Sequence, residues 1–124
     1  MAKYARIDHV ALSVSDLAKS VTFYESNFGF ETYSRDYVER ADLHIAYLRL
    51  GDTVLELTGR GESMSGFHFC LETDNFDDAV DTLKKNGVEV ATPPHATKAR
   101  VPRENGWRRV VFYGPDREQI EIRG

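Results

Sequence analysis

The chain repeats its own pattern, and this repeat limits the folds it can adopt. Aligning the sequence with itself at an offset of 59 residues places His9 on His68, each within an alternating, strand-like stretch. A helix-like stretch with apolar residues three or four apart follows in both copies, and each ends at a glycine, Gly29 or Gly87. Because 124 residues leave little core for two separate domains, we expect the two copies to depend on each other.

Each copy predicts a strand, a helix and then three strands. The apolar positions of the expected helices are Leu17, Val21, Tyr24 and Phe28 in the first copy and Phe76, Val80 and Leu83 in the second. Candidate N-caps are Ser15 or Asp16, and Asp74 or Asn75. The expected strands are 7–14, 31–38, 43–50 and 53–58, then 66–73, 88–92, 107–113 and 118–123. We predict an α+β fold of two tandem βαβββ modules, 1–60 and 66–124, joined by a glycine-rich hinge at 59–66 within one domain, 1–124.

The composition argues against several classes of protein. A net charge of −4 provides no overall positive field for nucleic acid. The single cysteine, Cys70, excludes an internal disulfide and a paired-thiolate zinc site. We find no export signal, no apolar run long enough to span a membrane, and no Walker loop, GxSxG or HExxH motif. We expect a cytoplasmic protein that acts on a small molecule, with no nucleic-acid or membrane partner.

Two histidines and two glutamates occupy matching places in the two copies. His9 and His68 alternate with the apolar residues of the first strand, and Glu56 and Glu121 do so in the last strand. Singly, each is more often a hydrogen-bonded or solvated strand residue than a functional one. Together they would converge if the two sheets curve around one cavity. Imidazole and carboxylate donors suit Ni²⁺, Co²⁺, Zn²⁺, Fe²⁺ or Mn²⁺ rather than Ca²⁺, and such a site favours enediolate stabilisation.

Four stretches carry a family resemblance: residues 9–30, Val54-Leu-Glu-Leu, Gly66-Phe-His-Phe and Phe112-Tyr-Gly-Pro-Asp-Arg-Glu-Gln-Ile-Glu-Ile. They resemble the vicinal oxygen chelate superfamily, also called glyoxalase/bleomycin resistance/dioxygenase, over essentially the whole chain. The resemblance implies that two modules form a cup-shaped mixed sheet around one divalent metal ion, usually in a homodimer with sites within one chain or across two. It also implies that His9, Glu56, His68 and Glu121 are the metal ligands.

Within the superfamily, the order His, Glu, His, Glu most resembles bacterial glyoxalase I. That likeness implies a lyase or isomerase of the lactoylglutathione lyase type, acting on a small 2-oxo compound or its thiol hemithioacetal. Methylmalonyl-CoA epimerases usually carry glutamine at the position of Glu56. Two positions depart from bacterial glyoxalase I. That enzyme usually has an arginine where this chain has Ser13, and an asparagine near the position of Arg60. Both of those residues help to hold glutathione in glyoxalase I. The alternatives are an epimerase or dioxygenase of the same superfamily, or a non-catalytic drug-binding or resistance protein.

The expected roles of individual residues follow from this chemistry. His9 and His68 would be neutral ligands, while Glu56 and Glu121 would be ligands of which one, preferably Glu121, also shuttles the proton. We expect 93–109 to be a long loop whose cations are either solvated or bind a carboxylate or phosphate. The substrate-binding candidates are Arg100, Arg103, Trp107 and Arg109. We expect His44 and His95 to be structural or on the surface, and Cys70 to be a neutral buried thiol rather than a nucleophile.

Overall fold

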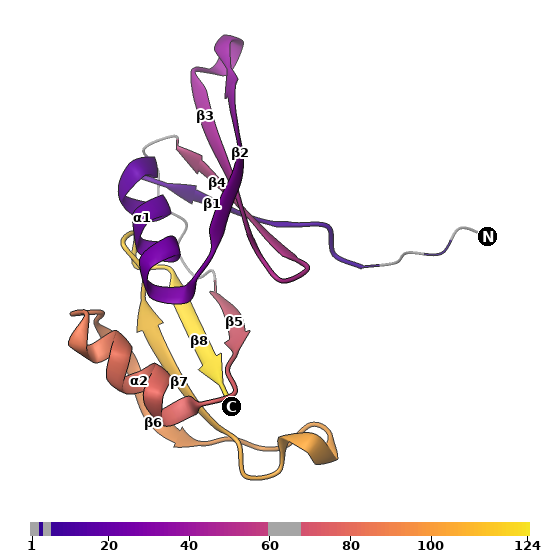
Figure 1. Ribbon diagram of the computed structural model, residues 1–124, viewed down its shortest axis with the longest axis vertical. Helices are drawn as coiled ribbons and strands as arrows, with labels where there is room; N and C mark the ends of the chain where they lie inside the picture. Colours follow the sequence, from indigo (N-terminus) through magenta and orange to yellow (C-terminus); the bar gives the residue numbers. More distant parts are fainter. Residues whose placement is uncertain (1–2, 4–5, 60–67) are drawn as a thin grey trace. The chain divides into compact units, whose positions relative to one another are not determined.

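The computed structural model describes residue 3 and residues 6–59 and 68–124. The chain divides into two compact units, Met1–Met64 and Ser65–Gly124. Each unit contains a four-stranded mixed sheet and one α-helix, as Figure 1 shows. The α+β prediction with two βαβββ modules is therefore confirmed. Residues 60–66 of the expected hinge lie outside the described residues. The curvature of both sheets around one cavity stays a prediction.

Unit 1 follows the predicted order closely. Its elements are β1 Val10–Val14, α1 Leu17–Phe28, β2 Glu31–Val38, the short 3₁₀ helix η1 Glu39–Ala41, β3 Leu43–Leu50 and β4 Thr53–Gly59. The sheet has the order β1-β4-β3-β2, in which β1 runs parallel to β4 and the other pairs are antiparallel. β1 is shorter than predicted, so His9 lies directly before it.

Local signals explain where α1 begins and ends. The Asp16 side chain accepts a hydrogen bond from the Lys19 amide at 3.0 Å, which satisfies one of the unpaired first-turn donors. Gly29 ends the helix with φ +77°, in the left-handed region that glycine adopts without steric cost. The core under α1 is apolar and includes Leu12, Val14, Val21, Tyr24, Leu48, Leu55 and Leu57.

Unit 2 repeats the same topology. Its elements are β5 His68–Glu72, α2 Phe76–Lys85, β6 Val90–Ala96, the 3₁₀ helix η2 Pro102–Glu104, β7 Arg108–Tyr113 and β8 Gln119–Arg123. The strand order is β5-β8-β7-β6, again with a parallel first pair. Asn75 is the N-cap of α2, and the buried residues include Phe76, Val80, Leu83, Val110, Phe112, Ile120 and Ile122. Neither α1 nor α2 is long and apolar enough to cross a membrane.

The prediction of a loop over 93–109 is wrong at both ends. β6 continues through Pro93 and Pro94 to Ala96, and η2 interrupts the remaining segment. β6 lies at the edge of its sheet, and its register shifts between Thr92 and His95. Proline is tolerated at such an edge and at a bulge, because no ladder hydrogen bond is lost there. The connecting loop is therefore 97–107, and Trp107 lies just before β7 rather than within it.

We expect Gly29→Ala to lower the free energy of unfolding by about 1 to 2 kcal/mol, because alanine is strained at positive φ. No atom lies within 4 Å of an added Cβ at this position, so the cost would come from the backbone alone. Gly29→Asn should cost less, since asparagine tolerates the left-handed region. Urea denaturation of both variants measures the difference. Equal stability of Gly29→Ala and the parent protein would contradict this explanation.

Candidate metal and proton-transfer site

His9 and Glu56 are in direct contact in unit 1. The parallel pairing of β1 with β4 places Ala11 opposite Glu56, and His9 lies two residues before Ala11, on the same side of the strand. The His9 Nε2 atom is 2.9 Å from Glu56 Oε2. The Glu56 side chain is 15% exposed and that of His9 is 41% exposed, so the pair lies at the surface of this unit with its carboxylate partly desolvated.

Asp8 holds the other nitrogen of the His9 ring. Asp8 Oδ2 lies 3.0 Å from His9 Nδ1. This hydrogen bond is the main cause that raises the pKa of His9, and Glu56 adds a smaller favourable charge. The pKa of Asp8 is lowered by the same bond and then by Arg6. Sequence reasoning missed Asp8, although an acidic residue beside a candidate histidine ligand was a usable signal.

The His9–Glu56 pair fits half of a divalent metal site. Two ligand atoms bound at about 2.1 Å and at a right angle lie about 3 Å apart, close to the distance observed here. A carboxylate on the non-ligating ring nitrogen is the usual second partner of a metal-bound histidine, because it fixes the ring and its tautomer. The donors therefore suit a borderline divalent ion, with Asp8 orienting the imidazole.

Unit 2 repeats the backbone register of this pair but not its contact. Cys70 lies opposite Glu121, and His68 lies two residues before Cys70, as His9 does before Ala11. Glu121, however, accepts a hydrogen bond from Arg109 Nε at 2.9 Å. Arg109 also donates to His95 Nε2 at 3.3 Å. Glu121 thus has the strand position of Glu56 but a guanidinium partner instead of an imidazole.

The predicted four-ligand set is divided between the units. His9 and Glu56 belong to unit 1, and His68 and Glu121 belong to unit 2. Among residues 6–59 and 68–124, no three or more His, Cys, Asp or Glu side chains gather closely enough to hold a metal ion. Binding of one ion by all four residues therefore stays a prediction.

Loop 97–107 is held together by a buried carboxylate and is attached to its sheet by Arg123. Glu104 is 1% exposed and accepts hydrogen bonds from the Arg100 amide at 2.8 Å and from the Arg100 guanidinium. These bonds lower the pKa of Glu104 to about 2. Arg123 of β8 donates to Thr97 Oγ1 and to the Lys98 carbonyl, both at 3.3 Å. These hydrogen bonds therefore give the loop a defined conformation.

The predicted substrate-binding residues all have partners within unit 2. Arg100 pairs with Glu104, and Arg109 pairs with Glu121. Arg103 pairs with Glu72 at 2.9 Å and lies over the Trp107 ring, 5.0 Å from its centroid. Both members of the Arg103 pair are more than half exposed, so this contact is weak and exchangeable. A role of these four residues in substrate binding stays a prediction.

Three further residues, His44, His95 and Cys70, were expected to have no role in binding or catalysis. His44 stacks on Tyr37 with ring centroids 4.4 Å apart, and His95 contacts Arg109. Desolvation raises the pKa of Cys70 to about 11, and Glu121 contributes in the same direction. Cys70 is thus a neutral thiol. Its predicted burial is wrong, because in unit 2 its side chain is exposed on the sheet face away from the apolar core.

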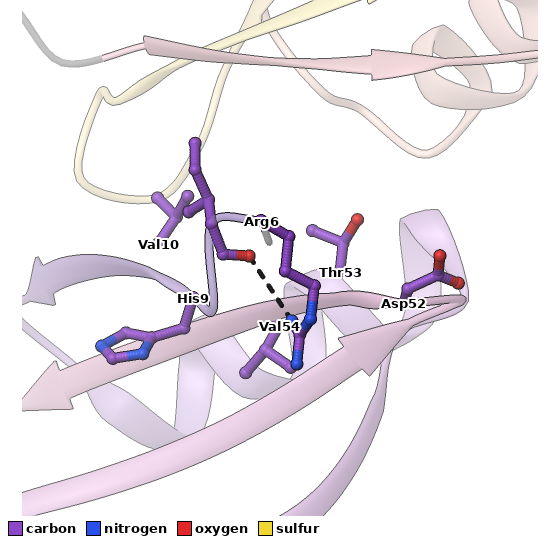
Figure 2. A pocket seen from close by; sticks show the side chains of 7 residues that line it. Arg6, His9, Val10, Asp52, Thr53 and Val54 are labelled. Carbon is purple, nitrogen blue, oxygen red and sulfur yellow. Dashed lines mark hydrogen bonds between the residues drawn. The ribbon is translucent and has the colours of Figure 1, made fainter. Parts of the chain in front are cut away.

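A cavity of about 340 Å³ adjoins the His9–Glu56 pair in unit 1. It lies between the segment before β1 and the turn into β4, as Figure 2 shows. Its lining residues are Arg6, Ile7, His9, Val10, Asp52, Thr53 and Val54. Arg6 donates to the neighbouring Ile7 carbonyl at 3.5 Å. A cationic side chain and apolar walls therefore lie beside the candidate ligand His9.

The fold, the repeated strand register and the His and Glu positions define a glyoxalase-fold protein. A family model for the Glyoxalase/Bleomycin resistance protein/Dioxygenase superfamily matches residues 6–122. The chain belongs to this superfamily. The resemblance predicted from the sequence is therefore confirmed.

Relatives of the chain are found both by sequence and by fold. Human mitochondrial methylmalonyl-CoA epimerase is 31% identical over 96 residues, which cover 67% of this chain and 54% of the human protein. The chain therefore spans just over half the length of this relative. A glyoxalase family protein from Enterococcus faecalis has a TM-score of 0.81 at 20% identity and 98% coverage of both chains. Glyoxalase I from Zea mays has a TM-score of 0.78 at 22% identity, over 95% of this chain and 44% of that one. The two structural matches show the fold alone.

We expect Asp8→Asn to lower the pKa of His9 in the metal-free protein, because the largest cause that raises this pKa is the hydrogen bond to Asp8. Glu56→Gln should lower it less, since the Glu56 charge contributes less. An NMR pH titration of the His9 ring protons measures both shifts. An unchanged His9 pKa in Asp8→Asn would contradict the orienting role of Asp8.

We expect Glu104→Gln to make the free energy of unfolding depend less on pH between pH 4.5 and pH 2. The folded-state pKa of Glu104, about 2, lies below the ordinary value of 4.5, so its ionised form stabilises the fold above pH 4.5. That stabilisation is lost as the pH falls from 4.5 towards 2. Thermal unfolding midpoints across this window should fall more steeply in the parent than in Glu104→Gln. Glu89→Gln, at an exposed ion pair of the same unit, is the matched control and should keep the parent slope. A parental slope in Glu104→Gln would overturn the assignment.

Proposed function

We propose that the chain catalyses metal-assisted proton transfer at a carbon next to a carbonyl group, and that the reaction is epimerisation of a carboxylated acyl thioester. The sequence relatives favour this reaction over the glyoxalase I type, because the named relatives are methylmalonyl-CoA epimerases at about 30% identity. The likeness to glyoxalase I is one of fold, at 22% identity. Epimerisation, one of the alternatives that the sequence left open, is therefore the leading proposal.

The observation that carries the proposal is the matched register of two glutamates. Glu56 lies opposite Ala11, and Glu121 lies opposite Cys70, so each occupies the same place relative to a histidine two residues earlier. Inversion at carbon needs a proton to leave one face and another to arrive at the opposite face. Two carboxylates supplied by equivalent positions of two modules suit this requirement. The Glu56 carboxylate is a departure of this chain from the glutamine that methylmalonyl-CoA epimerases usually carry at this position.

The chain's residues would divide the work as follows. His9, Glu56, His68 and Glu121 would hold one divalent ion, such as Ni²⁺, Co²⁺, Zn²⁺, Mn²⁺ or Fe²⁺. When bound, the ion would polarise the substrate carbonyl and make the adjacent C–H bond more acidic. One glutamate would accept the proton from carbon, and the other would return a proton to the opposite face. Asp8 would keep the His9 ring oriented during both steps.

The different neighbours of the two glutamates support Glu121 as the proton acceptor. Glu56 contacts the imidazole of a second proposed ligand, whereas Glu121 contacts Arg109, which is not a metal ligand. A carboxylate that leaves the ion would need another cation, and Arg109 already provides one at 2.9 Å. Arg109 would also join Arg100, Arg103 and Trp107 in binding the carboxylate of the substrate. A homodimer remains part of this proposal.

The departures from glyoxalase I agree with a substrate other than a glutathione adduct. Ser13 lies on β1, at the position where glyoxalase I usually has an arginine that helps to hold glutathione. The other departure, Arg60, lies outside the described residues. A glyoxalase I activity is therefore the second candidate. Its substrate, a hemithioacetal of glutathione, distinguishes it from the epimerase reaction.

We expect the protein, loaded separately with Ni²⁺, Co²⁺, Zn²⁺ and Mn²⁺, to exchange the C2 proton of methylmalonyl-CoA in ²H₂O with at least one of these ions. Mass spectrometry measures the label, and chiral analysis measures inversion. Glu121→Gln and Glu56→Gln should each lose at least about 100-fold in inversion rate, because a general acid or base contributes about 10² to 10⁴. A variant that keeps one base should still label one epimer.

Glu89→Gln is the control for these variants, since Glu89 pairs with Arg117 at the surface. Absence of exchange with every ion would overturn the epimerase proposal. Exchange on the methylglyoxal–glutathione hemithioacetal, without exchange on methylmalonyl-CoA, would assign the glyoxalase I reaction instead.

A further inference from the structure

We propose that Tyr33, Tyr47 and Arg49 of unit 1 form a binding subsite for a planar group that bears a carboxylate, on the same sheet face as Glu56. We call these three residues the tyrosine subsite. The inference goes beyond the proposed function, because an aromatic or conjugated carboxylate is a different class of ligand from the aliphatic acyl thioester of that reaction.

A β-bulge places Tyr33 on this face. Thr32 lies opposite Leu48, which is fully buried on the α1 side of the sheet, whereas Ser34 lies opposite Tyr47. Tyr33 is therefore the extra residue between two registers, and regular alternation does not fix its direction. Its ring is found 6.4 Å from the ring of Tyr47, at an angle of 42°. Bulges of this kind often re-aim a side chain beside a functional site.

Tyr47 links the subsite to the proposed metal ligands. It lies directly opposite Glu56 in the antiparallel β3–β4 pair, so the two side chains share one face about 5 Å apart at their Cβ atoms. The Tyr47 phenol can donate a hydrogen bond to an anionic ligand.

Arg49 gives the subsite its charge. Its guanidinium carbon lies 5.2 Å from the centroid of the Tyr33 ring. Its contact with Glu31 is long, at 3.6 Å, and both side chains are more than half exposed. Such a pair contributes little and can be exchanged for a ligand carboxylate without a large cost.

Exposure and chemistry together point to the ligand class. Tyr33 is 46% exposed, which leaves a large aromatic surface uncovered within its own unit. Two tilted phenol rings accept another flat group by edge-to-face or offset stacking, and a guanidinium pairs with a carboxylate. An aromatic or conjugated carboxylate satisfies both contacts at once, whereas a short aliphatic acid satisfies only the second.

The test is an NMR titration of the full chain, without metal, with phenylacetate and with propionate. We expect phenylacetate to bind about fivefold to tenfold more tightly, in line with one aromatic contact, and to shift the amides of Tyr33, Tyr47 and Arg49. Tyr33→Ala should abolish the advantage of phenylacetate. Tyr37→Ala is the matched control, because Tyr37 is 47% exposed on the same strand but stacks on His44, and it should keep the advantage. Arg49→Gln should weaken both acids, and Arg35→Gln should weaken neither.

Equal affinities for the two acids would overturn the proposal, as would shifts confined to other residues. Shifts of the Tyr33 amide that follow protein concentration rather than ligand would also overturn it, because a second copy would then cover the rings. The titration needs neither metal nor turnover. Exchange of methylmalonyl-CoA without a phenylacetate preference would therefore reject only the subsite, and the reverse result would reject only the epimerase reaction.

Discussion

The parallel pairing of the first and last strand of each module is the constraint on which the candidate site depends. A parallel pair fixes which residues lie opposite each other, and in both units it sets a glutamate opposite the residue two places after a histidine. Because side chains alternate along a strand, His and Glu then share one face without any loop to position them. The helix covers the other face, so apolar burial secures the register. A slip of one residue would turn Leu55 and Leu57 out of the core as well as misplacing Glu56.

The same register produces different surroundings in the two units. Glu56 contacts the imidazole of His9, which Asp8 orients, while Glu121 contacts the guanidinium of Arg109. Imidazole can give up its bound proton and accept an ion in its place, whereas guanidinium keeps its charge and can only serve as a partner for an anion. The repeat thus supplies two carboxylates at equivalent positions, and the side chains around them make their chemistry unequal.

Most of the fold could be predicted from the sequence, because its signals are local. Asp16 and Asn75 as N-caps, Gly29 at the C-terminus of α1 and the alternation of β4 each depend on neighbouring residues. The prediction failed where distant pairing decides the outcome. The prolines at 93 and 94 indicate a loop, yet an edge position and a register shift keep them in β6. For the same reason the bulge that re-aims Tyr33 has no local signal. The Asp8–His9 contact, by contrast, joins adjacent residues, and the sequence alone could have suggested it.

A duplicated module suits a reaction whose two half-steps mirror each other. Epimerisation removes a proton from one face of a carbon and adds one to the other, so each step asks the same of a carboxylate. The substrate of the proposed reaction, a carboxylated acyl thioester, would have unlike ends, and identical modules could not distinguish them. The differences between the units supply that distinction: unit 1 carries exposed aromatic rings and Arg49 beside Glu56, while unit 2 carries a loop fixed by Glu104 and lined with arginines. The unequal surroundings would then hold the two ends of the substrate in one orientation. The equivalent carboxylates would meanwhile act on the two faces of its reacting carbon.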